Sequence, residues 1–408
     1  MTAGDTLSQR HILVGVGGGI AAYKVAEVVS RLFQREAQVR VILTKSARQF
    51  ISPLTFATLS RHQAYTDKDF WQAGHPRPLH ILLGEWADLF LIAPLTANTL
   101  AKLVNGFADN LLTNAVLAST CPVVVAPAMN TDMWLQQSVQ ENWKKLATIP
   151  RYHPLYVNTG LLACDRHGQG RMAEASEIMT AIESIIYTRG KRDLTGKNIL
   201  ISGGGTREYI DTVRFLGNPA TGKMAIALAS ACYYRGGNVT LVAGNIFPEL
   251  LKSLPPIQII PVTTAQQMEK AMLTHFPQAD IVFMAAAVAD LKPKQCYSSK
   301  LSKKSLPLQL ELEYVTDIVA HLASIKQTHQ KLIGFAAQTG DIVTPALEKL
   351  SQKKLDAIVA NPIDKDNAGF ATDTNEAVFI AKNGIQTPLP PSSKLTLAHR
   401  IIDLTLQL

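Results

Sequence analysis

The chain has 408 residues, and at about 100 to 200 residues per domain this length predicts two or three domains rather than one. Hydrophobic residues make up 47% and charged residues 18%, ordinary globular values that exclude a disordered, fibrous or low-complexity protein. The net charge of +8 is spread over both halves without a basic tail, so the charge pattern does not favour nucleic acid as a partner.

The apolar stretches, the amino terminus and the cysteines bear on the cellular location of the protein. The longest apolar runs fall far short of the roughly 20 residues that span a bilayer, so no transmembrane helix is predicted. The first residues, MTAGDTLSQR, lack the apolar centre of a secretory signal, and we expect a cytoplasmic protein. Cys121, Cys164, Cys232 and Cys296 form no CxxC pair, so neither a structural zinc site nor a dithiol motif is predicted.

In chain order, the first half alternates short apolar runs with helical patterns, which is typical of a parallel sheet covered by helices. Buried strands are predicted at residues 11–16, 39–44, 89–93 and 123–126. The stretch YTRGKRDLTGK at residues 187–197 is polar and contains two glycines, and the pattern restarts after it. We therefore predict two domains, residues 1–189 and 190–408.

Glycines follow the first predicted strand, where backbone amides can approach an anion without obstruction by side chains. The fingerprint GxGxxG would need a third glycine where Ile20 stands, so a mononucleotide is favoured over a dinucleotide. Small polar residues follow the next strands, and capping of the following helix is the alternative explanation for each. The predicted cofactor-binding residues are Gly18, Gly19, Ile20, Thr44, Ser46, Thr96, Ala97, Asn98 and Thr99.

Three longer segments are specific when taken together. They are HILLGEWADLFLIAPLTANTLAK at residues 80–102, PAMNTDMW at 127–134 and ACDRHGQGRM at 163–172. Over most of residues 10–185 the chain resembles the flavin-dependent cysteine decarboxylases, specifically the decarboxylase half of the bifunctional coenzyme A biosynthesis flavoproteins. The resemblance implies a flavodoxin-like domain with FMN. In that family the flavin oxidises the thiol of phosphopantothenoylcysteine, carbon dioxide leaves, and the reduced flavin returns the hydride.

The resemblance also implies roles for single residues of the first half. His80 corresponds to the catalytic histidine, although His75 is a nearby competitor and a buried core histidine is the simpler explanation. Asn130 corresponds to the residue that holds the substrate carboxylate, and Met133 would shape the pocket. Cys164, in a glycine-containing segment too flexible for a well-buried strand, corresponds to a cysteine on a mobile flap that protonates the intermediate. Arg171 is a candidate contact to the substrate phosphate.

The second half opens with KNILISGGGT, which repeats the strand-and-glycine pattern of RHILVGVGGGI near the start. Further strands are predicted at residues 239–243, 257–262, 281–287, 332–336 and 357–360. The fold class is therefore α/β, with two doubly wound Rossmann-like domains and mostly parallel sheets. Ligands of such sheets bind beyond the carboxyl ends of the strands, so we expect the chemistry in the loops that follow them.

The segment SGGGTREYIDTVRFLGNPATGKM at residues 202–224 contains the spacing GxxxxGK of a P-loop. A P-loop is not predicted, because Met224 stands in place of the magnesium-binding Ser or Thr and no clear strand precedes Gly217. Over roughly residues 196–400 this half instead resembles the phosphopantothenate–cysteine ligase domain. Asn218 then corresponds to the residue that stabilises the acyl-nucleotide intermediate. The chain departs from the family pattern at Ala220, Thr221, Ala225 and Thr316.

The resemblance implies a nucleotide site in the second half. Lys300 corresponds to a mobile lysine that closes over the triphosphate and the intermediate. The full set of implied nucleotide contacts is Asp290, Lys300, Thr316, Asp317, Ile318, Val319, Phe335, Lys349 and Lys353. The bacterial two-domain enzymes use CTP, which is favoured here over ATP, and the triphosphate implies Mg²⁺ with ligands that the sequence does not assign.

Together, the two resemblances describe consecutive reactions. The second half would join phosphopantothenate and cysteine through an acyl-CMP intermediate, and its product would be the substrate of the first half. A decarboxylase of peptide carboxyl-terminal cysteines would leave the second half without a task. A regulatory phosphatase-binding flavoprotein is the alternative of another class. The resemblance also implies a homo-oligomer, based on trimers and extending up to a dodecamer.

Overall fold

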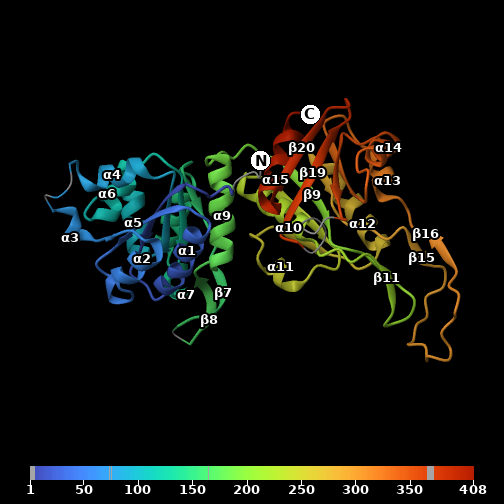
Figure 1. Cartoon of the computed structure of the whole chain (residues 1–408). Helices are drawn as coiled ribbons and strands as arrows, with labels where there is room; N and C mark the ends of the chain where they lie inside the picture. The colour runs from blue at the N-terminus through green and yellow to red at the C-terminus, as the bar shows by residue number, and fades with distance from the viewer. Residues whose placement is uncertain (1–4, 73, 75, 164, 365–371) are drawn as a thin grey trace. The chain divides into compact units, whose positions relative to one another are not determined.

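The computed structural model describes residues 5–72, 74, 76–163, 165–364 and 372–408. Their contacts form two compact units, Asp5–Lys191 and Arg192–Leu408 (Figure 1). Both units are α/β, as predicted. Within the described ranges, no helix combines the length and the apolar character that a membrane span requires.

The amino-terminal unit is built on a parallel six-stranded sheet with the order β3-β2-β1-β4-β5-β6. Without the two-residue edge strand β3, this is the flavodoxin-like order, and the strand order reverses between β1 and β4. The four strands predicted in this half are confirmed as β1, β2, β4 and β5. The strands are β1 (His11–Val16), β2 (Gln38–Leu43), β3 (Ala64–Tyr65), β4 (Leu89–Leu95), β5 (Val123–Pro127) and β6 (Tyr152–Pro154).

Helices cover this sheet because their apolar residues recur at helical spacing. In α1, Val25, Val28, Val29 and Leu32 are buried. The exposed face is mostly polar but also carries Tyr23 and Phe33. The helix α5 begins at its cap residue Thr96 and ends at Gly106, which has a positive φ of 74°. The helices are α1 (Ala22–Gln34), α2 (Pro53–Ser60), α3 (Asp67–Phe70), α4 (Leu79–Trp86), α5 (Ala97–Asn105), α6 (Leu111–Ala118), α7 (Thr131–Leu135), α8 (Gln137–Ala147) and α9 (Ala175–Thr188), with a 3₁₀ turn at Ala47–Gln49.

An antiparallel hairpin, β7 (Asn158–Leu161) and β8 (His167–Arg171), stands apart from the sheet. The sequence argues against a well-buried strand here, and the described residues form a strand pair that is mostly exposed or half-buried. Gly170 allows the hairpin to approach the loop after β5 closely, because a Cβ at this position would lie 2.1 Å from the carbonyl oxygen of Met129. The Met129 N–H donates to the Gly170 carbonyl at 3.0 Å, so the hairpin is held against the loop that follows β5.

The carboxyl-terminal unit has an eight-stranded sheet of order β13-β12-β9-β14-β17-β18-β19-β20. The first six strands are parallel and in Rossmann order, with the reversal between β9 and β14. The strands predicted in this half are confirmed, but the antiparallel pair β19 and β20 was not foreseen. The strands are β9 (Asn198–Gly203), β12 (Asn238–Ala243), β13 (Gln258–Pro261), β14 (Ile281–Met284), β17 (Lys331–Gln338), β18 (Ala357–Pro362), β19 (Thr374–Ala381) and β20 (Gln386–Ser393).

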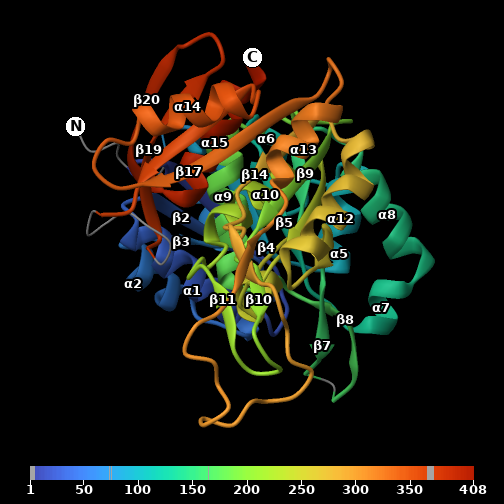
Figure 2. The same cartoon turned by 90° about the vertical axis from the view of Figure 1, so that its right-hand side faces the viewer.

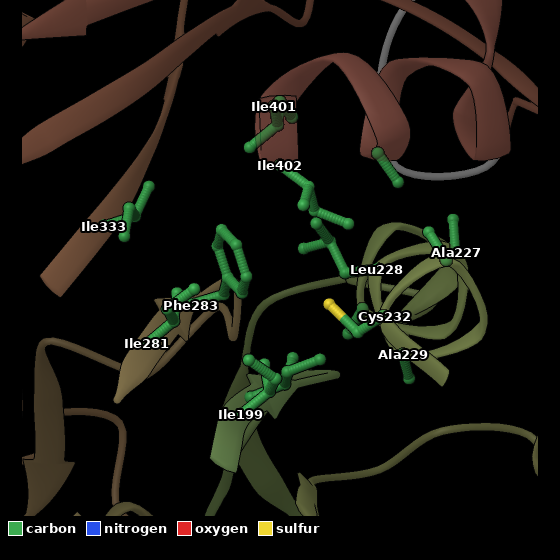
Figure 3. Close-up of a cluster of buried hydrophobic side chains, with 14 of the residues drawn as sticks. Ile199, Ala227, Leu228, Ala229, Cys232, Ile281, Phe283, Ile333, Ile401 and Ile402 are labelled. Atoms are coloured by element: carbon green, nitrogen blue, oxygen red, sulfur yellow. The ribbon is translucent and has the colours of Figure 1, made fainter. Parts of the chain in front are cut away.

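Helices pack on both faces of this sheet, as a doubly wound fold requires. Figure 3 shows Leu228 and Cys232 of α10 beside Ile401 and Ile402 of α15, packed against Phe283 and other residues of the sheet. A second apolar cluster joins α12, α13 and α14 to the strands. The helices are α10 (Lys223–Tyr234), α11 (Pro248–Lys252), α12 (Ala265–His275), α13 (Ile318–Ile325), α14 (Thr344–Gln352) and α15 (Lys394–Leu406), with a 3₁₀ turn at Phe276–Gln278.

Two short hairpins extend from the carboxyl ends of this sheet and lie side by side in both views (Figures 1 and 2). They are β10 (Arg207–Tyr209) with β11 (Phe215–Gly217), and β15 (Leu291–Pro293) with β16 (Leu312–Tyr314). The prediction that no clear strand precedes Gly217 is wrong, because β11 ends on that residue. Since β11 pairs with β10 and lies outside the main sheet, it is not the strand of a P-loop.

Candidate active sites

A cleft of about 530 Å³ lies where the strand order of the first sheet reverses, a volume that suits a cofactor or small ligand. The loops after β1, β4 and β5 and the β7–β8 hairpin form its walls. Its lining residues are Gly18, Gly19, Ile20, Ala21, Tyr23, Lys24, Thr96, Ala97, Ala128, Met129, Asn130, Met133, Leu161, Leu162, Ala163, Gly170, Arg171 and Met172.

The glycines after β1 are required by close packing and by the cleft. A Cβ on Gly17 would lie 2.3 Å from the carbonyl oxygen of Pro94, and one on Gly18 would lie 2.2 Å from the Cβ of Ser46. Gly19 has only a side-chain atom of Pro94 near it, at 3.8 Å, and opens into the cleft. This backbone cradle beside the mixed apolar and polar wall of Met129, Met133 and Thr96 fits a flavin mononucleotide.

The polar residues predicted for the cofactor are only partly in the cleft. Thr96 and Ala97 line it, and the Thr96 hydroxyl also accepts the Thr99 N–H as the cap of α5. Thr99 is buried and Asn98 is exposed, and neither lines the cleft. The Thr44 hydroxyl closes the turn after β2, donating to the carbonyl of Val16 and accepting from the N–H of Ala47. Ser46 packs under Gly18, so its contact is with the loop.

Asn130 and Met133 do line the cleft, at the start of α7. The Asn130 Oδ1 accepts the Met133 N–H at 3.0 Å, so this side chain is the cap of α7. The cap uses the Oδ1 of Asn130 as an acceptor. A substrate carboxylate would instead accept a hydrogen bond from the Nδ2 of the same amide. Thr131 donates to the carbonyl of Gln169 at 2.8 Å and fixes this loop to β8.

The cleft also holds cations that sequence reasoning missed or placed only in part. Arg171 lines it as predicted, and Lys24 lines it from the first turn of α1. Both side chains reach the carboxylate of Glu174, Lys24 at 2.7 Å and Arg171 at 3.2 Å. In the sequence, Lys24 is one polar residue of an amphipathic helix, and only its place shortly after the glycine loop could have drawn attention to it.

The predicted proton-transfer residues are not part of the cleft as described. His80 lies on α4, near the opposite end of the unit from the β7–β8 hairpin (Figure 1). Its ring meets Phe70 edge-on at 5.3 Å, and its buried Nδ1 has no hydrogen-bond partner among the described residues. Cys164 and the competing His75 lie outside the described residues.

A second cleft, of about 710 Å³, lies at the strand-order reversal of the carboxyl-terminal sheet. It brings together eight of the nine residues predicted to contact the nucleotide, along with Asn218. These are Asn218, Asp290, Thr316, Asp317, Ile318, Val319, Phe335, Lys349 and Lys353. The loops after β9 and β14 are fixed to each other there: Ala287 donates to the carbonyl of Gly204 at 2.9 Å, and Ala289 donates to the Thr206 hydroxyl at 2.9 Å.

An ion pair between Asp317 and Lys353, at 2.9 Å, crosses the wall of this second cleft. Burial raises the pKa of Asp317, but the hydrogen bonds from Lys353 and from the Ala320 N–H outweigh burial and hold the pKa below its usual value. Asp317 therefore stays ionised at neutral pH and positions Lys353, while Lys349 adds a second positive charge to the lining.

Lys300 does not line the second cleft. It is exposed in the long loop between β15 and β16. The next residue, Leu301, is fixed to the β10–β11 turn, because its N–H donates to Asp211 at 3.2 Å and its carbonyl accepts from Arg214 at 3.2 Å.

A smaller cleft of about 140 Å³ shares Ala286, Ala287, Phe335 and Ala337 with the second cleft. Its lining includes Lys223 at the start of α10 and Lys394 at the start of α15. Burial, followed by the charge of Lys223, lowers the pKa of Lys394 to about 8. Because the two clefts share wall residues, a ligand in the smaller cleft would lie beside a ligand in the second cleft. In the described ranges, no three His, Cys, Asp or Glu side chains gather as a metal site.

Comparisons with known proteins fit the two sites. A family described as "Flavoprotein" matches residues 2–187, and the "DNA/pantothenate metabolism flavoprotein C-terminal domain" matches residues 194–408. The coenzyme A biosynthesis bifunctional protein CoaBC of Bacillus subtilis (strain 168) is 42% identical over 398 residues, 97% of each chain. The chain belongs to the CoaBC family. It is therefore a bifunctional enzyme of two coenzyme A biosynthesis steps, a decarboxylation and a ligation.

A second relative agrees with this assignment, and two solved structures are similar to parts of the chain. The CoaBC protein of Mycobacterium tuberculosis (strain ATCC 25618 / H37Rv) is 38% identical over 408 residues, covering 97% of this chain and 96% of its own. A solved C-terminal domain of a CoaBC protein is 33% identical, with a TM-score of 0.45, covering 53% of this chain and 98% of its own. A mutant PPC decarboxylase complexed with pantothenoylaminoethenethiol is 36% identical, with a TM-score of 0.40, covering 43% and 96%.

Proposed function

We propose that the carboxyl-terminal unit joins cysteine to 4'-phosphopantothenate with CTP, and that the amino-terminal unit decarboxylates the product to 4'-phosphopantetheine with FMN. The observation that carries the proposal is the presence of one cleft at the strand-order reversal of each unit. Each cleft gathers many of the residues that the resemblance assigns to its own reaction.

In the ligation, a carboxylate oxygen of phosphopantothenate attacks the α-phosphorus of CTP, and pyrophosphate leaves. The amine of cysteine then attacks the acyl carbon of the acyl-CMP, loses a proton and releases CMP. Lys349 and Lys353 supply positive charge to the phosphates, and Phe335 offers an apolar surface to the nucleotide. The Asn218 amide is a neutral donor suited to charge that develops on the acyl phosphate.

Mg²⁺ would enter this site with the triphosphate, because Mg²⁺ commonly uses phosphate oxygens and one or two carboxylates. Asp290 is the carboxylate in the cleft for which no ion pair competes among the described contacts. The smaller cleft shares a wall with the nucleotide cleft, and its Lys223 and Lys394 would receive the phosphate group of the other substrate.

In the decarboxylation, FMN would accept the electrons of the substrate thiol group and return them after carbon dioxide has left. Gly18 and Gly19 would hold it through the backbone, beside Thr96 and Ala97. The Asn130 amide would orient the substrate carboxylate, and Met133 would exclude water from it.

We further propose that the decarboxylase site is completed by a second copy of the chain, which would bring His80 to the cleft. The exposed apolar residues Ile20, Tyr23, Met133 and Leu161 line the cleft and support this arrangement, because exposed apolar groups around a ligand site mark an interaction surface. Cys164 keeps its assignment from the resemblance as the residue that protonates the intermediate. Lys300 keeps its assignment as the lysine that closes over the triphosphate.

The nucleotide half of the proposal is tested without cysteine. The purified chain is incubated with phosphopantothenate, Mg²⁺ and either CTP or ATP, and pyrophosphate and the acyl-nucleotide are measured by mass spectrometry. CTP should give both products. Equal or better reaction with ATP would contradict the choice of CTP. The flavin released on denaturation, separated by chromatography, should be FMN, and FAD would contradict the cofactor assignment.

A further inference from the structure

The feature that leads beyond the assigned residues is a pair of cations sharing one carboxylate in the decarboxylase cleft. The Lys24 Nζ donates to both oxygens of Glu174, at 2.7 and 2.9 Å, and the Arg171 Nη2 donates to one of them at 3.2 Å. Lys24 and Arg171 both line the cleft. Two positive charges therefore face a single negative charge, and the cleft lining keeps a positive surplus at this point.

The backbone of Glu174 is held in place by Glu177. Glu177 is buried and accepts hydrogen bonds from the Glu174 N–H at 2.5 Å, the Tyr156 hydroxyl at 2.9 Å and the Asn158 amide at 2.8 Å. By contrast, the Glu174 side chain is 46% exposed. The Glu174 carboxylate also belongs to the capping box at the start of α9, where it faces the backbone N–H of Glu177. When it leaves the cations, Glu177 still holds the Glu174 N–H, so the backbone of this turn stays in place.

The two cations differ in the way that suits a phosphate. The guanidinium of Arg171 presents a planar fork of donors, whereas the ammonium of Lys24 is a compact point charge. A phosphate monoester carries about −1.5 to −2 charges at pH 7 and offers three acceptor oxygens. It would match the charge of the pair better than the single charge of Glu174 does.

Phosphate could come from either of two ligands of the decarboxylase. The backbone amides of Gly18 and Gly19 suit one phosphate, that of FMN. Lys24 and Arg171 are carried by other positions, α1 and β8, and form a second anion position in the same cleft. The two anion positions match the two phosphorylated ligands. Because Gly18 and Gly19 suit the phosphate of FMN, Lys24 and Arg171 are available for the phosphate of the substrate.

We propose that Lys24 and Arg171 bind the 4'-phosphate of phosphopantothenoylcysteine, and that this phosphate displaces Glu174. The inference rests on the proposed decarboxylase function and adds the part of the site that selects phosphorylated substrate. Lys24 is then a substrate-binding residue, and Glu174 is a positioning residue that holds the two cations in place before the substrate arrives.

The test compares phosphopantothenoylcysteine with its unphosphorylated form, pantothenoylcysteine, as substrates of the full chain. Lys24→Met should lower kcat/KM for the phosphorylated substrate by about 10- to 100-fold, the range of one lost charge-assisted hydrogen bond. It should change kcat/KM for pantothenoylcysteine by less than about 2-fold, and Lys24→Arg should recover part of the loss. Glu174→Gln should lower KM for the phosphorylated substrate alone.

Lys102→Met is the matched control, because Lys102 is also a half-buried helical lysine with one carboxylate partner, Asp109 at 2.5 Å, and lies outside the cleft. It should leave both substrates unchanged. Bound FMN and riboflavin are measured for every variant by absorbance.

The outcomes separate the sources of phosphate. If Lys24→Met lost FMN but still bound riboflavin, Lys24 and Arg171 would bind the phosphate of the cofactor. That result would overturn their assignment to the substrate. Equal losses for both substrates with flavin retained would overturn phosphate recognition. Inactivity of the unsubstituted chain toward both substrates would instead contradict the proposed function itself.

Discussion

At the scale of single residues, several side chains of the first cleft serve the fold and the proposed chemistry at once. Asn130 caps α7 with its oxygen and lines the cleft, and Thr96 does the same for α5. For these residues, capping and ligand binding are not competing explanations. The cap fixes the rotamer, and a fixed rotamer presents the rest of the side chain to the ligand.

Asn130→Asp separates the two tasks of this side chain. Asp keeps an oxygen for the Met133 N–H, so the melting temperature should stay within a few degrees of the parent. It removes the amide donor and places a negative charge beside the substrate carboxylate, so decarboxylation should fall by about 100-fold or more. Product formation by both units is followed by mass spectrometry. An unchanged decarboxylation rate would remove Asn130 from the site.

His399 provides a residue-scale prediction for stability. Burial, followed by the nearby charge of Arg235, lowers the pKa of His399 to about 3. Between about pH 6.5 and 3 the unfolded chain binds a proton here that the folded chain does not, so stability is lost as the pH falls. Relative to His399→Leu, the parent should lose about 1.4 kcal/mol per pH unit between pH 6 and 4. Denaturant unfolding at several pH values measures this, and a constant difference would contradict it.

At the scale of elements, the close approach of the β7–β8 hairpin to the loop after β5 depends on Gly170. This residue has a positive φ of 131°, and a Cβ there would meet the Met129 carbonyl oxygen. Gly170→Ala should therefore displace the hairpin, raise proteolysis within it and lower decarboxylation, with ligation unaffected.

Gly106→Ala is the control for Gly170→Ala, because Gly106 also has a positive φ but has nothing within 4 Å of the added Cβ. It should cost only about 1 kcal/mol of stability, the cost of the backbone conformation, and should leave decarboxylation unchanged. Equal effects of the two substitutions would show that contact with Met129 is not what matters.

The elements also show what a sequence can predict. Strands buried on both faces, such as β4, are continuous apolar runs and can be recognised in the sequence. Because such strands are parallel, the loops that follow them lie at the same edge of the sheet. The edge strand β20 carries Pro388, Pro390 and Pro391, which mask its pattern yet are tolerated at a sheet edge. The three hairpins outside the sheets are only three to five residues long in each strand, too short for a period to be read.

The candidate sites divide in the same way. Residues in loops after predicted strands, such as Gly19 and Asp290, are placed in the clefts because the sheet topology places those loops. Lys24 was missed because its partner Glu174 is 150 residues away in the chain. His80 and Lys300 were assigned by resemblance alone, and the structure of one chain does not bring either to its cleft.

At the scale of the whole molecule, a decarboxylase site shared between copies can be tested by complementation. His80→Gln and Asn130→Asp chains should each be inactive in decarboxylation. When they are expressed together and purified as mixed oligomers, some sites would combine an intact His80 from one copy with an intact Asn130 from another. Activity should then return to a measurable fraction of the parent. Mixed oligomers without activity would place both residues in the site of one chain.

One chain is expected to carry out both reactions, because the product of the ligase is the substrate of the decarboxylase. The regulatory alternative has no support from the Bacillus subtilis relative, which matches 97% of the chain and is named as a coenzyme A biosynthesis bifunctional protein. The most direct test is mass spectrometry of the purified chain with phosphopantothenate, cysteine, CTP and Mg²⁺. We predict 4'-phosphopantetheine together with CMP and pyrophosphate. The absence of any product that depends on CTP would contradict the account.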